Sequence, residues 1–176
     1  MRPESKYARV EWERRFLLHN FPAGEKVTRI RRINDRYIES TTLRLRQQSD
    51  NDGETVFKLT QKLPGGMARG EQGMITSMYL TREEFSVLAT LSAKELTKVR
   101  HSVPPFGIDV FEGALSGLVL AEAEFHSATE ASALVLPSFI VAEVSDDRRF
   151  TGGSLATSSR QELEKWLAEH GVGLGT

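Results

Sequence analysis

The chain contains no cysteine. Without thiols it can form no disulfide bond, use no thiolate nucleophile and bind no zinc through cysteine. No apolar run approaches the roughly 20 residues needed to span a bilayer, so we predict no membrane segment. Residues 1–15 are charged throughout and lack the hydrophobic stretch of a secretory signal. Together these absences predict a cytoplasmic location.

Neither sign of charge is in excess. The 23 Lys and Arg residues and the 24 Asp and Glu residues give a net charge of −1. A general nucleic-acid binder has a basic surplus, so we predict no nucleic-acid partner. The 176 residues, of which 39% are hydrophobic, suffice to bury the core of one domain. We predict a single domain over residues 1–176, with a core at about 7–156 and a C-terminal helix at about 158–170.

Most of the chain shows the pattern of β-strands separated by turns. Strands are predicted near residues 7–18, 26–33, 36–47, 55–63, 68–79, 96–103, 106–113 and 118–126. Turns or tight connections are expected at Asn34-Asp35, Asp50–Gly53, Pro64–Gly66 and Gly113–Gly117. Three helices are expected to begin at Thr81, at Ser127, and at Ser158 or Ser159. This set of elements predicts an α+β fold or a closed barrel.

Charged residues recur two positions apart along several of these strands. Residues i and i+2 of a strand share a face and lie about 6.6 Å apart. Lys58 and Lys62 form one wider pair, and four closer pairs carry like charges: Glu11/Glu13, Arg44/Arg46, Lys98/Arg100 and Glu122/Glu124. The plain alternative is a solvated strand face, because like charges at this spacing cost only about 0.6 kcal/mol in water.

The number of like pairs favours a binding site, since solvated strands rarely place like charges side by side. Basic pairs indicate phosphate or carboxylate, and acidic pairs indicate a hard cation such as Mg²⁺ or Mn²⁺. A nucleotide or inorganic polyphosphate with its metal ion would satisfy both. The apolar residues between the charges, such as Leu45, Phe57 and Phe125, would then face outward and pack against the helices.

These motifs, in this order, resemble those of the CYTH domain, or triphosphate tunnel metalloenzyme, family. The family's ExExK motif corresponds to Glu11-Trp12-Glu13-Arg14-Arg15. Further matches, in family order to about residue 156, are Leu43–Arg46, Lys58–Lys62, Arg69–Glu71, Lys98–Arg100, Ile108–Phe111, Gly117–Phe125 and Glu143–Ser145. The resemblance implies an α+β, mainly β fold: a closed eight-stranded antiparallel β-barrel that forms a tunnel, with flanking helices.

The resemblance also implies the roles of individual residues. The phosphates would be bound by Arg15, Arg44, Arg46, Lys58, Lys62, Arg69, Lys98 and Arg100. Mg²⁺ or Mn²⁺ would be bound by Glu11, Glu13, Glu71, Glu122, Glu124 and Glu143. Glu11, Glu13 and Arg15 would form the catalytic group. Arg15 stands where the family has lysine, and arginine keeps the charge but cannot donate a proton as lysine can.

The predicted function is metal-dependent hydrolysis of a small-molecule triphosphate, with inorganic triphosphate as the leading substrate. The protein would act as a monomer or a homodimer. One alternative is a class IV adenylate cyclase, which makes cAMP from ATP. Another is a thiamine-triphosphatase, for which Trp12, Tyr37 or Phe106 could stack on the ring. The third is a protein that binds polyphosphate or a nucleotide without catalysis.

Overall fold

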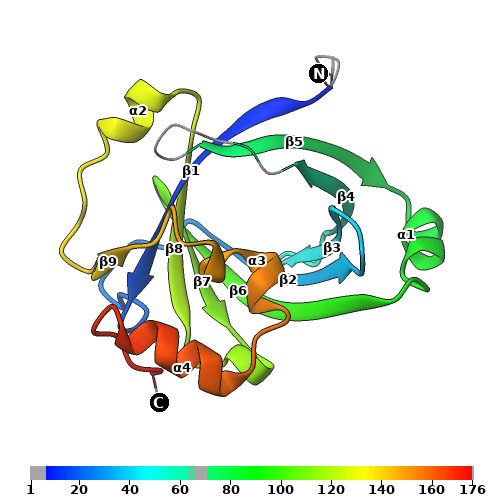
Figure 1. The fold of residues 1–176 in the computed structure, drawn as a ribbon. Helices are drawn as coiled ribbons and strands as arrows, with labels where there is room; N and C mark the ends of the chain where they lie inside the picture. The colour runs from blue at the N-terminus through cyan, green and yellow to red at the C-terminus, as the bar shows by residue number, and fades with distance from the viewer. Residues whose placement is uncertain (1–6, 64, 66–70, 176) are drawn as a thin grey trace.

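One antiparallel sheet closes on itself in the computed structural model, which describes residues 7–63, 65 and 71–175. Around the barrel the strands follow the order β5-β4-β3-β2-β6-β7-β8-β1, and β1 pairs with β5 to close it (Figure 1). The strands are β1 (Arg9–Leu18), β2 (Arg29–Ile38), β3 (Leu43–Asp50), β4 (Thr55–Leu63), β5 (Glu71–Leu80), β6 (Ala93–Val103), β7 (Phe106–Phe111) and β8 (Val119–Phe125). A short strand, β9 (Ala142–Glu143), adds to β1. The predicted eight-stranded antiparallel barrel is confirmed.

Strand β1 is the seam of the barrel. Its first half pairs with β5, with a register shift between Glu11 and Trp12, and its second half pairs with β8. In the β1–β8 register Glu13 lies opposite Glu124, and Arg15 lies opposite Glu122. The seam therefore brings the acidic residues of two sequence-distant motifs onto neighbouring strands.

Apolar side chains pack outside the barrel wall and at one end of it. The outer cluster contains Phe16, Ile108 and Ala121, and apolar residues of the segments 21–27 and 134–140 pack against it. A second cluster joins Leu17 and Leu120 to the C-terminal helix α4 (Arg160–Ala168). Helix α1 (Arg82–Leu88) contacts β4 and lies beside the end of β5 (Figure 1), and Phe85 packs against Phe57 with tilted rings whose centroids are 4.6 Å apart. Of the residues predicted to face outward, Phe57 packs on α1 and Phe125 packs against the outer cluster.

The helix start signals are confirmed. Thr81 and Ser159 form capping boxes for α1 and α4, and Ser127 caps α2 (Ala128–Ser132). Three short helices were not predicted from the sequence. They are α3 (Gly152–Leu155) and the 3-10 turns η1 (Gly113–Leu115) and η2 (Arg148–Phe150). No helix among the described residues has the length and apolar character needed to cross a membrane.

One predicted turn is wrong. Asn34-Asp35 lies in the middle of β2, and the chain turns instead after Ile38, where Ser40 has a φ of 60°. The Asp35 carboxylate is buried against two arginines, and these contacts outweigh the local preference of aspartate for turns. The connections Asp50–Gly53 and Gly113–Gly117 are confirmed. Of Pro64–Gly66, only Gly65 belongs to the described residues.

Candidate active site

A cavity of about 420 Å³ occupies the barrel interior. Among the described residues, eight basic and four acidic side chains line it, contributed by β1, β3, β4, β6 and β8. A surplus of positive charge in an enclosed, low-dielectric space attracts a polyanion. The lining contains Arg9, Glu11, Glu13, Arg15, Arg44, Arg46, Lys58, Lys62, Lys98, Arg100, Glu122 and Glu124.

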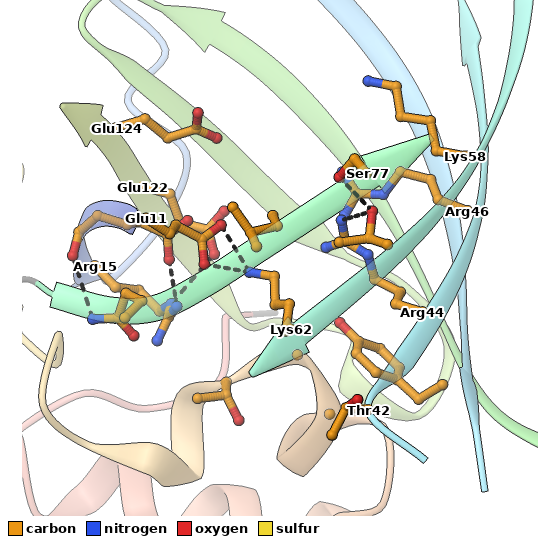
Figure 2. A pocket seen from close by; sticks show the side chains of 18 of the residues that line it. Glu11, Arg15, Thr42, Arg44, Arg46, Lys58, Lys62, Ser77, Glu122 and Glu124 are labelled. Carbon is orange, nitrogen blue, oxygen red and sulfur yellow. Dashed lines mark hydrogen bonds and ion pairs between the residues drawn. The ribbon is translucent and has the colours of Figure 1, made fainter. Parts of the chain in front are cut away.

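Nine of these twelve charged side chains form two groups of opposite sign, while Arg9 and Arg15 share β1 with Glu11 and Glu13. Glu11 and Glu13 on β1 and Glu122 and Glu124 on β8 form what we call the acidic wall. Figure 2 shows Glu11, Glu122 and Glu124 on one side of the cavity, with Arg44, Arg46 and Lys58 on the other and Lys62 between them. The set Arg44, Arg46, Lys58, Lys98 and Arg100 is called the basic wall below.

The two buried carboxylates of the acidic wall have opposite acid–base character. Burial, reinforced by the negative charge of Glu122, raises the pKa of Glu13 above its usual value. Burial would also raise the pKa of Glu122, but Lys98, Arg100 and Arg15 outweigh it and hold that pKa well below its usual range. Close carboxylates with divergent pKa values are typical of sites that bind cations or transfer protons.

Two buried aspartates orient the basic wall. Asp35 on β2, 1% exposed, accepts hydrogen bonds from Nε and Nη2 of Arg46 at 2.6 and 2.7 Å. Asp109 on β7 accepts bonds from Nε and Nη2 of Arg100, both at 2.6 Å, and a further bond from Lys98 at 2.5 Å. Bidentate pairing fixes the plane of each guanidinium and leaves its Nη1 outside these bonds.

Asp35 escaped the sequence reasoning because aspartate next to asparagine is a turn signal. The alternation along the strand is the signal that could have identified it. Ile33, Asp35 and Tyr37 are two residues apart, so their side chains share one face of β2. Burial would raise the pKa of Asp35, but Arg46 and Arg44 outweigh it and lower the pKa. Asp35 therefore stays ionised and keeps its arginines charged and in place.

Ion pairs connect the two walls. Arg15 Nη2 lies 2.5 Å from Glu13 Oε1, and Arg15 Nε lies 3.3 Å from Glu122 Oε1. The other oxygen of Glu122 accepts a hydrogen bond from Arg100, which is bound in turn to Asp109. Positive and negative groups therefore alternate from Glu13 on β1 to Asp109 on β7.

One end of the cavity is bounded by Tyr37, Thr42 and the start of α3. A Cβ atom added to Gly152 would lie 1.9 Å from the hydroxyl oxygen of Tyr37, so only glycine fits there. Burial raises the pKa of Tyr37, which keeps its hydroxyl protonated as a hydrogen-bond donor. The other two residues considered for stacking lie elsewhere. Phe106 is buried in the outer cluster, and Trp12 alternates with Glu11 and Glu13 onto the outer face of β1.

Eleven of the predicted site residues line this cavity together: Glu11, Glu13, Arg15, Arg44, Arg46, Lys58, Lys62, Lys98, Arg100, Glu122 and Glu124. Glu143 lies elsewhere, where Arg14 donates to both of its oxygens at 2.9 and 2.7 Å. Glu71 begins β5 opposite Trp12 and does not line the cavity. Arg69 lies outside the described residues.

The acidic wall has the donor chemistry for the metal ion that the resemblance implies. Mg²⁺ and Mn²⁺ prefer carboxylate oxygens, which Glu11, Glu13, Glu122 and Glu124 supply. No three His, Asp or Glu side chains of the described residues converge as they stand on one metal position. The reason is visible in the contacts: Glu11 is paired with Lys62, and Glu13 and Glu122 are paired with Arg15. In this structure, these carboxylates are therefore bound by cations of the protein itself.

A closed barrel whose interior places a basic wall opposite an acidic wall defines a polyanion-binding tunnel protein. A scan of the chain against protein-family models finds no match. A protein of Nitrosomonas europaea named inorganic triphosphatase is 35% identical over 158 residues, which cover 85% of this chain and 98% of the relative. The chain belongs to the triphosphate tunnel metalloenzyme (CYTH) family.

Solved structures agree with this assignment. Two crystal structures of one protein, NE1496, described as hypothetical in one and as an inorganic triphosphatase in the other, are each 27% identical to this chain, with a TM-score of 0.55. Each covers 85% of this chain, and the match spans 99% of the first structure and 96% of the second. The fold is therefore shared over most of the chain.

Proposed function

We propose that this protein hydrolyses inorganic triphosphate to pyrophosphate and phosphate, with Mg²⁺ or Mn²⁺ as cofactor. The observation that carries the proposal is that eight cations and four carboxylates line one cavity inside the barrel. The Nitrosomonas europaea relative, named for this activity, favours hydrolysis over the cyclase and over binding alone.

The basic wall would hold the phosphates. Arg46 and Arg100 are fixed in plane by Asp35 and Asp109, so their positions are set before the substrate binds. Fixed cations around the phosphoryl group stabilise the charge that spreads over its oxygens in the transition state, and phosphoryl transfer depends mainly on such positioning.

In the reaction, a water oxygen forms a bond to the terminal phosphorus while the bond from that phosphorus to the bridging oxygen breaks. The electron pair of the broken bond stays on pyrophosphate. Glu13 would receive the water proton, because it lines the cavity that would hold the phosphates. Its Oε2 makes no hydrogen bond to the described residues, so it is available for that proton.

Glu11, Glu13, Glu122 and Glu124 would hold the metal ion, which when bound would neutralise phosphate charge and lower the pKa of water. Further positive charge for the phosphates would come from Arg44, Lys58 and Lys62, which also line the cavity. None of these three is bound to Glu13 or Glu122.

The test is phosphate release from triphosphate with Mg²⁺ and with Mn²⁺, for the wild type, Glu13→Gln and the control Glu25→Gln. Glu25 is exposed and does not line the cavity. We expect metal-dependent release by the wild type and the control, and a loss of at least about 100-fold in Glu13→Gln. Release without metal, or unchanged release by Glu13→Gln, would refute the proposal. Product analysis with ATP separates the alternatives, because a cyclase gives cAMP and a binder gives no product.

A further inference from the structure

The acidic wall is neutralised by cations of the protein itself. Glu11, Glu13 and Glu122 have six carboxylate oxygens, and five of them accept hydrogen bonds from Lys62, Arg15 or Arg100. These are the same oxygens that a divalent cation would need. The protein's own cations and a metal ion therefore compete for one set of lone pairs.

Arg15 is the central competitor. It bridges Glu13 and Glu122, the two carboxylates that face each other diagonally across β1 and β8. Its side chain is almost fully buried, with the residue 4% exposed, yet Nη1 has no hydrogen-bond partner among the described residues. A buried N–H group without a partner is uncommon and costly. Arg15 lines the cavity that would receive the phosphates, so rotation of its side chain could bring this unpaired group to them.

Hydrogen bonds fix the backbone of Arg15, while its side chain bridges Glu13 and Glu122. The Arg15 amide donates to Ser145 Oγ at 3.0 Å, and its carbonyl accepts from the Val144 amide at 2.8 Å. A movement of the guanidinium thus requires only side-chain rotation. The chemistry of arginine matters here, because its fork can bind two carboxylates at once, whereas the single ammonium group of a lysine has no such fork.

We propose that Arg15 is a displaceable counter-ion: it occupies the Glu13–Glu122 pair until a divalent cation binds there, and it then turns its guanidinium to the triphosphate. This inference rests on the metal site of the proposed function. Metal binding would release a cation for the phosphates, and phosphate binding would draw that cation off the metal site. By linkage, each ligand then raises the affinity for the other.

The experiment measures Mn²⁺ binding by the signal of free Mn²⁺ in electron paramagnetic resonance, at pH 8 and without phosphate. The proteins are the wild type, Arg15→Gln, Arg15→Lys and the matched control Arg44→Gln. Arg44 lines the same cavity, and its nearest carboxylate is that of Asp35, with its Nε 3.7 Å away. We expect about tenfold tighter Mn²⁺ binding in Arg15→Gln, a smaller gain in Arg15→Lys, and a change within about twofold in Arg44→Gln.

The Arg44→Gln control distinguishes two causes of tighter Mn²⁺ binding. One is the removal of Arg15 from the Glu13–Glu122 pair, and the other is the loss of a positive charge anywhere in the cavity. An equal gain in Arg44→Gln, or unchanged or weaker binding in both Arg15 variants, overturns the inference. If Arg15→Gln does not fold, Arg15→Lys decides alone, since it keeps the charge and only loses the fork. A repeat with imido-bridged triphosphate, which is not hydrolysed, should tighten Mn²⁺ binding more in the wild type than in either Arg15 variant.

The same preparations distinguish this inference from the proposed function. Wild-type Mn²⁺ binding and phosphate release, with no gain in the Arg15 variants, overturn the counter-ion role alone. Wild-type protein that binds no Mn²⁺ overturns the metal site and the counter-ion role together.

Discussion

Replacing Asp35 with asparagine removes the anion that holds two arginines of the basic wall. Arg46 donates two hydrogen bonds to this carboxylate, and Arg44 Nε lies 3.7 Å from it. Hydrogen bonds to charged groups contribute about 1.5–3 kcal/mol each. Asparagine keeps one acceptor oxygen but points an NH₂ group at the other guanidinium N–H. Breaking a buried ion pair costs about 3–5 kcal/mol, so we expect Asp35→Asn to lower the free energy of unfolding by about 3 kcal/mol.

Urea denaturation followed by circular dichroism measures this loss. With a slope of about 2 kcal/mol per molar urea, the midpoint should fall by about 1.5 M at pH 7.5. The pH dependence is a second signature. The folded-state pKa of Asp35 is lowered, so its contribution is fully present above the unfolded-state value of about 3.9 and is lost as pH falls through the folded-state pKa. The difference between wild type and variant should be constant from pH 5 to pH 8 and shrink below pH 4.

The control is Asp52→Asn, an exposed aspartate in the turn after β3, for which we expect a change within about 0.5 kcal/mol. The same loss in both variants, or an Asp35→Asn effect that does not diminish in acid, would refute the assigned ion pairs. A folded Asp35→Asn should also show weaker triphosphate binding in a saturation assay, because Arg46 is no longer held in plane.

Further substitutions test the end of the cavity at Tyr37 and the assignment of the metal ligands. Gly152→Ala should push Tyr37 from the end of the cavity, lower the free energy of unfolding by about 1–3 kcal/mol and reduce phosphate release. Adding Tyr37→Phe, which removes the closest atom, should recover part of the stability in a urea titration, and no recovery would contradict the contact. Glu143→Gln should destabilise the fold through its lost pair with Arg14 but leave Mn²⁺ affinity unchanged, whereas Glu122→Gln should weaken Mn²⁺ binding. Weakened Mn²⁺ binding in Glu143→Gln would contradict this prediction and would indicate that Glu143 is a metal ligand.

The regular parts of the fold and site were accessible from the sequence, because they follow from local periodicity. Strands with charges at i and i+2 put those charges on one face, and the caps at Thr81 and Ser159 mark helix starts by themselves. Short or irregular elements were not accessible. Strand β9 has two residues, too few for an alternation to show which face Glu143 takes.

The sequence alone determined the alternation of charged and apolar residues, hence that the paired charges of each strand share one face. It also determined which residues could form the acidic and basic walls, because each pair lies within one strand. Only the tertiary structure decided which carboxylate binds which cation. Arg15 meets Glu122 across 107 positions of the chain, and that contact depends on the register between β1 and β8. Register is a property of strands packed together, so no local pattern specifies the partner of Arg15 or the inward position of Asp35.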